Sequence, residues 1–170
     1  SYMLLKKNNL KYRDEVLSEI EKVVDSGWYL LGEKLKSFET DWASYCGTEY
    51  AVGVGSGLDA LVLIFKAYQE LGILKKGDEV IVPANTFIAS IIAIIQSDLV
   101  PILVEPCPES YNIDANKITE KITAKTKVIL AVHLYGQVAD MVGINKIAKE
   151  NRLLVVEDAA QAHGVVLNNK

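Results

Sequence analysis

The segment GDEVIVPANTFIASIIAIIQSDLVPILV, residues 77–104, contains the pattern that decides the fold. Two short apolar runs, at 79–83 and 100–104, lie on either side of an apolar stretch at 86–96 that is long enough to form a helix. A strand, a helix and a second strand in this order predict a crossover unit whose two strands are parallel. Pro101 falls at the start of the second strand, where a missing N–H group is tolerated.

The same alternation continues from residue 50 towards residue 170. Further strands are predicted at 50–55, 127–132 and 153–157. Further helices are predicted at 57–71, 115–122 and 141–150. Repeated strand–helix units with nearly continuous apolar strands are typical of an α/β domain, in which helices cover both faces of a mostly parallel sheet. We therefore expect βα repeats over 50–170, with the helix at 86–96 deeply buried because it is apolar almost all round.

Residues 1–49 have a helical pattern instead of this alternation. In 11–25 the apolar residues fall on one helical face, and Ser26-Gly27 end the pattern. In 33–46 the residues that recur three and four positions apart before Gly47 are Leu35, Phe38, Trp42 and Tyr45. We predict two amphipathic helices that pack on a larger body.

Composition excludes several classes of protein. The 170 residues carry a formal net charge of −4 without a basic cluster, so nucleic acid is not an expected partner. The longest apolar stretch, at 87–95, is too short to span a bilayer, and the first residues lack a signal-peptide core. The cysteines and histidines lack metal-binding spacing, so we expect no metal site and two reduced thiols in a cytoplasmic protein. These residues are Cys46, Cys107, His133 and His163.

The first candidate for ligand binding is the glycine-rich turn GSGLD at 55–59, which precedes a predicted helix. Ligands of open α/β sheets bind at the carboxyl ends of the strands, and free N–H groups at a helix start bind anions. Residue 58 is Leu, which breaks the G-x-G-x-x-G pattern, so a phosphate monoester fits better than a pyrophosphate. The candidate anion site is Ser56, Gly57 and Leu58. Ser56 and Asp59 also match a capping box, so a capped helix that binds nothing remains an alternative.

The second candidate is PANTFIAS at 83–90, which ends one predicted strand and opens a helix. We expect Asn85 or Thr86 to cap this helix. Phe87 then falls in the first helical turn, where its ring can either stack on a flat ligand or belong to the core.

The third candidate is the acidic pair Glu157-Asp158 at the end of the last predicted strand. A carboxylate there is costly unless it is paired, and its partner can be a ligand cation, a helix end or a salt bridge. Together the three candidates describe a flat ring with a basic nitrogen and one phosphate. Pyridoxal 5′-phosphate fits, with its nitrogen on Asp158 and its ring against Phe87. A protonated ring nitrogen makes this cofactor an electron sink.

With these motifs in place, the sequence closely resembles the pyridoxal-phosphate-dependent sugar aminotransferases of the DegT/DnrJ/EryC1/StrS family. The segments that carry the resemblance are 26–61, 77–90, 132–141 and 156–164. The resemblance implies a fold type I, aspartate-aminotransferase-like large domain and a homodimer with its sites at the subunit interface. It implies the cofactor contacts given above, and it places Gln161 near the ring hydroxyl of the cofactor. The family often has Thr at position 58, so Leu58 leaves only a backbone contact there.

The resemblance also predicts what this chain lacks. The Schiff-base lysine of the family is expected beyond Lys170. Residues 1–170 therefore resemble the N-terminal part of the large domain, which is truncated here. We expect this chain alone to be inactive. The implied reaction transfers an amino group, from glutamate, onto a keto-6-deoxyhexose linked to a nucleoside diphosphate. The spellings GLDAL and EDAAQAHG are most similar to members that act at C3 of dTDP sugars. A sugar 3-dehydratase and a non-catalytic fragment remain alternatives.

Overall fold

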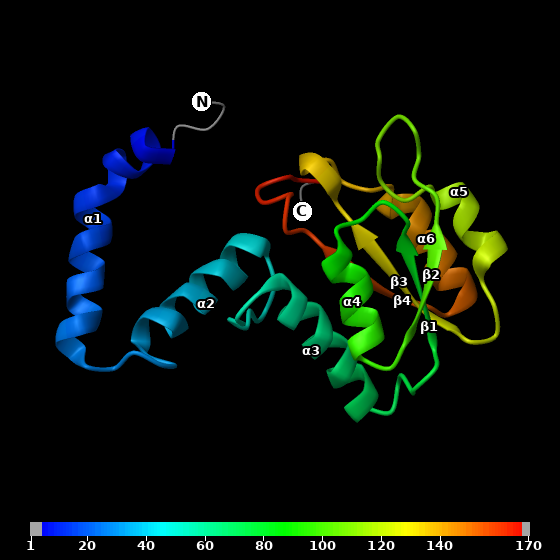
Figure 1. Cartoon of the computed structure of the whole chain (residues 1–170), viewed down its shortest axis with the longest axis horizontal. Coiled ribbons are helices and arrows are strands. Elements are labelled where there is room, and N and C mark those ends of the chain that lie inside the picture. Colours follow the sequence, from blue (N-terminus) through cyan, green and yellow to red (C-terminus); the bar gives the residue numbers. More distant parts are fainter. Residues whose placement is uncertain (1–4, 168–170) are drawn as a thin grey trace. The chain divides into compact units, whose positions relative to one another are not determined.

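The chain is described here by a computed structural model that covers residues 5–167. These residues form two compact units, with the boundary between Gly53 and Val54 (Figure 1). Within residues 5–167, none of the helices combines the length and the apolar character needed to cross a membrane.

The first unit contains the two helices that the sequence predicts, α1 (Leu5–Ser26) and α2 (Glu33–Cys46). Helix α1 begins six residues earlier than the predicted start at residue 11. Gly47 ends α2 in the left-handed conformation, with φ of 67°, which a residue without a Cβ adopts readily. The N–H group of Thr48 then donates to the carbonyl of Ala43 at 2.9 Å, which satisfies one of the last carbonyls of the helix.

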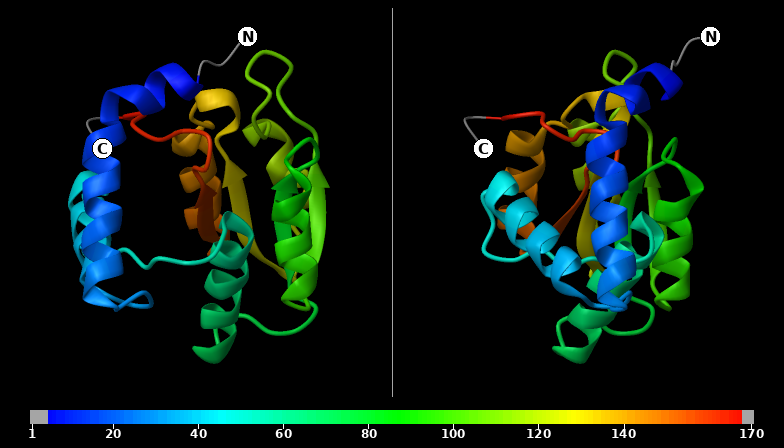
Figure 2. Two further views of the ribbon diagram at one scale, coloured as in Figure 1. Left: turned by 60° about the vertical axis from the view of Figure 1, so that its left-hand side comes forward. Right: turned by 90° about the vertical axis from the view of Figure 1, so that its left-hand side faces the viewer.

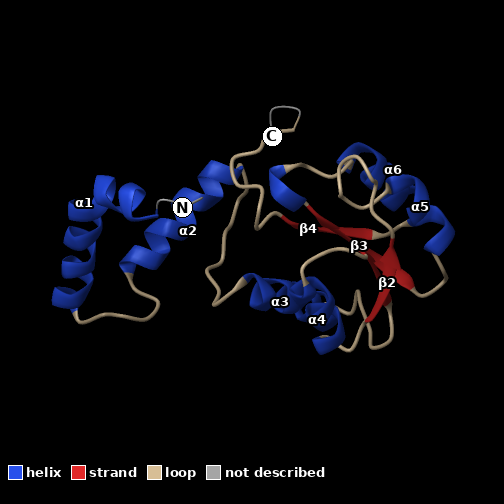
Figure 3. Cartoon of the chain, turned by 45° about the horizontal axis from the view of Figure 1, so that its top comes forward, coloured by secondary structure: helices blue, strands red, loops and turns tan. Residues whose placement is uncertain are grey.

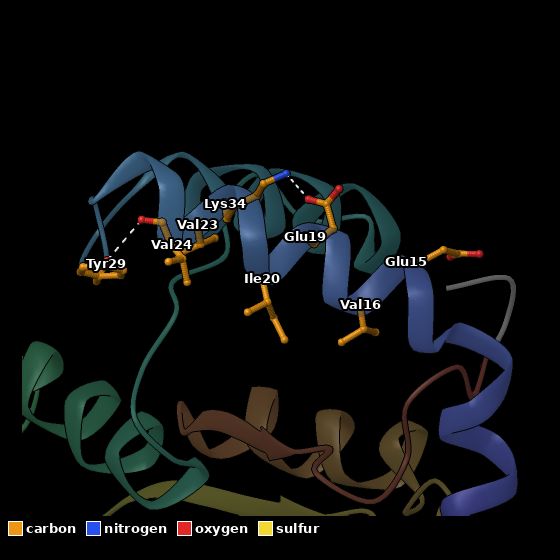
Figure 4. Close-up of a pocket in the computed structure, with 8 residues that line it drawn as sticks. All are labelled: Glu15, Val16, Glu19, Ile20, Val23, Val24, Tyr29 and Lys34. Carbon is orange, nitrogen blue, oxygen red and sulfur yellow. Dashed lines mark hydrogen bonds and ion pairs between the residues drawn. The ribbon is translucent and has the colours of Figure 1, made fainter.

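Helix α1 has no buried residue, so its apolar face is not covered within the first unit. Figure 4 shows Val16, Ile20 and Val24 on this face, where they help to line a shallow hollow. On α1, Glu19 accepts hydrogen bonds from Lys22 and from Lys34 of α2, which lower the pKa of its carboxyl group to about 2. The packing of these helices on a larger body stays a prediction.

The second unit is built on a four-stranded parallel sheet with the order β2-β1-β3-β4. The strands are β1 (Glu79–Pro83), β2 (Val100–Val104), β3 (Thr126–Val132) and β4 (Leu154–Asp158). The crossover unit predicted from residues 77–104 is confirmed, because β1 and β2 are parallel neighbours joined through a helix. Pro101 lies in β2, a terminal strand in this order, where a missing N–H group leaves the central pairings intact.

The predicted strand at 50–55 is wrong, because these residues form no strand. A strand needs a neighbour that pairs with its N–H and C=O groups, and each ladder of the described sheet joins two of the four strands above. The side chains of Tyr50 and Val52 are 75% and 78% exposed. Gly53 and Gly55 also weaken any strand here, since they have no side chain to pack.

The helices of the second unit cover both faces of the sheet, as predicted (Figure 3). They are α3 (Gly57–Glu70), α4 (Ile88–Gln96), α5 (Ala115–Ile118) and α6 (Met141–Asn151). Side chains of β3 alternate between the faces. Leu130 packs into the core beneath α3 and α4, and Ile129 packs into the core beneath α5 and α6.

Helix α4 is less deeply buried than its apolar sequence predicts. Ser90 and Ile94 are fully covered, but Ile88 and Ile95 are 55% and 58% exposed. One side of the helix packs against α3 and the sheet. The opposite side has no covering element among residues 54–167, so apolar character alone did not decide its burial.

All four strands end at one edge of the sheet, which we call the carboxyl edge. Helices α3 and α4 run in the opposite direction to the strands, so their N-terminal ends point towards this edge (Figure 2). The segments that follow β1, β3 and β4 begin here as well. The carboxyl edge therefore contains the start of both helices and the end of β4. The candidate residues that were selected from the sequence lie in these segments.

Candidate functional site

The two acids at the end of β4 point to opposite faces of the sheet. Val156 packs into the core beneath α3 and α4. Because side chains alternate along a strand, Asp158 lies on this same face and Glu157 lies on the face of α5 and α6. Only Asp158 shares its face with the N-terminal ends of α3 and α4.

Glu157 is engaged by His133, which directly follows β3. The Nε2 atom of His133 lies 2.9 Å from a carboxylate oxygen of Glu157. The Nδ1 atom accepts the N–H group of Ala139 at 3.2 Å, so Nε2 bears the ring proton and donates it to Glu157. This hydrogen bond lowers the pKa of Glu157 below its ordinary value, although partial burial opposes the shift. Glu157 therefore has a hydrogen-bonded partner within the protein, and its role here is structural.

Asp158 has a different set of contacts, none of which is an ion pair within residues 5–167. Its Oδ2 atom accepts the hydroxyl of Ser90 at 3.3 Å, and its Oδ1 atom accepts the N–H group of Ala160 at 3.1 Å. The backbone N–H of His133 donates to the Asp158 carbonyl at 3.0 Å, which holds the strand end in place. A carboxylate has about four acceptor positions, so Asp158 can still accept a bond from a cationic N–H group.

Gln161 is oriented by the turn that follows β3. Its Oε1 atom accepts the N–H group of Tyr135 at 2.8 Å, which leaves the Nε2 amide group as the end that can donate to a ligand. Tyr135 has a left-handed φ of 57°, a conformation that costs free energy for a residue with a Cβ. Buried Asn112 stabilises this turn, since it accepts the N–H of Leu134 at 2.9 Å and donates to the carbonyl of Gln137 at 3.0 Å.

The turn before α3 is a capped helix start with room beside it. Ser56 is the N-cap, and its hydroxyl accepts the Asp59 N–H at 3.1 Å and donates to the Asp59 carboxylate at 2.8 Å. The predicted helix cap is therefore real and occupies the Ser56 side chain, although Asp59 accepts the Ser56 hydroxyl and not its backbone N–H. The first N–H groups of the helix, at Gly57 and Leu58, have no acceptor inside the helix. A Cβ added at Gly57 would meet no atom within 4 Å, so this space can admit a phosphate oxygen.

Leu58 packs partly against the core beneath α3 and α4, which leaves only its backbone N–H for an anion.

Phe87 is 72% exposed, so the reading of this residue as a core aromatic is wrong for the described chain. It is the N-cap residue of α4 and makes no side-chain cap. The caps predicted from Asn85 and Thr86 are also wrong. Asn85 donates to the carbonyl of Tyr111 at 2.9 Å, and Thr86 contacts Ser90.

The sequence reasoning missed Ser90, His133 and Asn112 as residues that hold the site. Ser90 had a visible signal, because it is the one polar residue in the apolar stretch at 87–95. His133 and Asn112 had no local signal, since their partners come from segments that are distant in the chain. Within residues 5–167 there is no group of three metal-ligating side chains, and Cys46 and Cys107 are free thiols.

Taken together, the parallel sheet, the acid at the end of β4 and the helix starts at the same edge define an α/β domain of the fold type I pyridoxal-phosphate enzymes. The model of the DegT/DnrJ/EryC1/StrS aminotransferase family matches residues 11–170, and the chain belongs to this family.

Two relatives illustrate the similarity. The chain is 52% identical over 169 residues to dTDP-3-amino-3,6-dideoxy-alpha-D-galactopyranose transaminase of Aneurinibacillus thermoaerophilus, covering 99% of this chain and 46% of that protein. It is 47% identical over 152 residues to dTDP-3-amino-3,4,6-trideoxy-alpha-D-glucose transaminase of Streptomyces venezuelae, covering 89% and 39%. The chain thus spans less than half the length of these relatives.

Two solved structures share the fold of this chain. DesV of S. venezuelae superimposes with a TM-score of 0.88 at 46% identity, over 94% of this chain and 42% of that one. The GDP-4-keto-6-deoxy-D-mannose-3-dehydratase of E. coli, solved with hydrated PLP, superimposes with a TM-score of 0.85 at 35% identity, over 91% and 40%.

Proposed function

We propose that this chain is the N-terminal portion of a nucleotide-sugar aminotransferase and contributes most of its pyridoxal-phosphate contacts. The observation that supports this best is the environment of Asp158. Its carboxylate is oriented by two donated hydrogen bonds, has no described ion pair, and lies on the face of the sheet towards which α3 and α4 begin. A carboxylate in this position suits a protonated ring nitrogen.

Each candidate residue has a role in this proposal. Asp158 accepts the ring N–H group, and the Nε2 group of Gln161 donates to the ring oxygen. Phe87 stacks on the ring, and the N–H groups of the Ser56–Leu58 turn bind the phosphate. When bound, the cofactor supplies an electron sink for a carbanion formed at the substrate. The lysine that would bind it covalently and move the proton is expected beyond Lys170.

The proposed substrate is a dTDP-linked keto-6-deoxyhexose that is aminated at C3, with glutamate as the donor. Support comes from the two transaminases of dTDP-3-amino sugars that are 52% and 47% identical to this chain. We further propose a cytoplasmic homodimer with sites at the subunit interface. The 3-dehydratase reaction is the second candidate, since the E. coli dehydratase shares the fold at 35% identity. The higher identity of the transaminases favours amination.

The experiment uses the intact protein that carries this sequence, with a dTDP-3-keto-6-deoxyhexose and nitrogen-15-labelled glutamate. An aminotransferase gives a sugar nucleotide that contains the labelled nitrogen. In a parallel reaction with a GDP-4-keto-6-deoxyhexose, a 3-dehydratase gives a 3-deoxy sugar nucleotide, with glutamate as the reductant and the labelled nitrogen released as ammonium. Borohydride reduction followed by peptide mass spectrometry identifies the lysine that binds the cofactor. Absence of both products and of a cofactor adduct would support the non-catalytic alternative.

A further inference from the structure

The buried hydroxyl of Ser90 lies between the start of α4 and the end of β4. Ser90 is 1% exposed in a helix whose other residues up to Ile95 are apolar. A buried hydroxyl costs free energy unless it is hydrogen-bonded. Ser90 has two such partners, the Thr86 hydroxyl at 3.0 Å and the Asp158 carboxylate at 3.3 Å.

The direction of these two hydrogen bonds follows from chemistry. An ionised carboxylate can only accept, so Ser90 must donate its single hydrogen to Oδ2 of Asp158. Thr86 must then donate its own hydrogen to Ser90. Aligned hydrogen bonds of this kind strengthen one another, so the hydroxyl of Thr86 makes Ser90 a better donor to the carboxylate.

We propose that Thr86 and Ser90 together are positioning residues that orient the carboxylate of Asp158. Through Asp158 they keep the ring nitrogen of the bound cofactor protonated. Ser90 fixes one carboxylate oxygen and the Ala160 N–H fixes the other, so the carboxylate cannot turn away from a ligand. This inference rests on the proposed binding of pyridoxal phosphate at Asp158.

The test uses the intact protein loaded with pyridoxal phosphate that carries nitrogen-15 in its ring. The nitrogen chemical shift distinguishes a protonated from an unprotonated ring. We expect Ser90→Ala to move this signal towards the unprotonated value and to lower kcat by about five- to tenfold, the effect of one ordinary hydrogen bond. Ser90→Thr retains the hydroxyl and should restore the wild-type signal.

Thr86→Val tests the pair without changing a fully buried position. It should shift the nitrogen signal less than Ser90→Ala does, and it should have no further effect in the Ser90→Ala protein. If either single variant lowers thermal stability but leaves the nitrogen signal unchanged, the positioning role is wrong and the hydroxyls are only structural.

Asp158→Asn separates this inference from the proposed function. If Asp158→Asn moves the signal and neither hydroxyl variant does, cofactor binding at Asp158 stands and only the positioning role fails. If Asp158→Asn also leaves the signal unchanged, the ring nitrogen does not contact Asp158, and both proposals fail.

Discussion

Asp158 and Glu157 are adjacent in the chain, yet β4 places them on opposite faces of the sheet. Glu157 has a buried histidine as its partner, whereas Asp158 receives only a hydroxyl and a backbone N–H group. The difference between the structural carboxylate and the one that we propose binds a ligand therefore comes from strand geometry, because the two side chains are chemically alike.

Asp158→Asn should lower kcat/KM of the intact protein, because an amide cannot stabilise a protonated ring nitrogen. One hydrogen bond between charged groups contributes about 2–3 kcal/mol, which corresponds to a loss of roughly 30- to 160-fold. Steady-state kinetics measures this loss. Glu157→Gln is the matched control, with nearly unchanged turnover. Equal losses in the two variants would contradict the assignment of the cofactor to Asp158.

The contact between His133 and Glu157 should make stability depend on pH. The hydrogen bond lowers the folded-state pKa of Glu157 below its ordinary value of 4.5. The contact therefore stabilises the fold above about pH 4.5 and loses this contribution as the pH falls through the folded-state pKa. Glu157→Gln should lower the thermal unfolding midpoint at neutral pH and have a smaller effect in acid. Glu150→Gln, on the exposed side of α6, should show no such trend.

Phe87→Ala should weaken cofactor binding with little effect on stability. The ring is 72% exposed, so its removal should change the free energy of unfolding by less than about 0.5 kcal/mol. Lost stacking of about 1 kcal/mol should raise the cofactor Kd roughly fivefold. Ile88→Ala, which removes a neighbouring exposed side chain, should leave Kd unchanged. A large loss of stability with normal Kd would mean that Phe87 is covered in the intact protein.

At the scale of elements, the turn before α3 is compatible with both functions that the sequence could not separate. Ser56 and Asp59 cap the helix through side chains, while the N–H groups of Gly57 and Leu58 remain available to an anion. The sequence analysis treated a capped helix and an anion site as alternative interpretations of this turn. In the structure the two are compatible, because the cap uses side chains and leaves the backbone N–H groups free.

Gly57→Val should raise the cofactor Kd while the stability of the protein without cofactor stays nearly unchanged. The new Cβ meets no protein atom within 4 Å, so a loss of affinity would reflect crowding of the ligand alone. Equilibrium titration of the cofactor measures Kd, and Gly57→Ala should give a smaller increase. Unchanged affinity in both variants would leave the turn as a helix cap only.

At the scale of the whole molecule, the described residues expose an unusual amount of apolar surface. On α1 and α4 the exposed apolar side chains include Val16, Ile20, Val24, Ile88 and Ile95. Exposed apolar surface of this kind marks an interface or leads to association. The chain also spans less than half the length of its relatives.

A protein made of these 170 residues alone should therefore associate in solution and lack aminotransferase activity. Light scattering over a range of concentrations measures the association. Borohydride reduction with the cofactor should give only scattered, low-level lysine adducts. A monomer with one stoichiometric adduct and turnover of a keto-sugar nucleotide would contradict both this prediction and the expected position of the catalytic lysine.

The sequence by itself determined the helices and strands whose signals are local. Apolar periodicity placed α1, α2, α3 and α6 and all four strands, because side-chain spacing reports which face of an element is buried. The glycine turn, Phe87 and Asp158 were also selected as candidates, since each lies at the start of a predicted helix or at the end of a predicted strand. The family resemblance then added Gln161 and agreed with the cofactor already inferred from the motifs.

Only the tertiary structure decided which contacts those residues make. The absence of a strand at 50–55, the exposure of α4 and the pairing of Glu157 with His133 each depend on segments that are distant in the chain. Ser90 meets Asp158 across 68 positions. Periodicity describes one element at a time, whereas hydrogen bonds and burial depend on what folding places beside that element. The candidate residues could therefore be named from the sequence, whereas the orientation of their side chains could not.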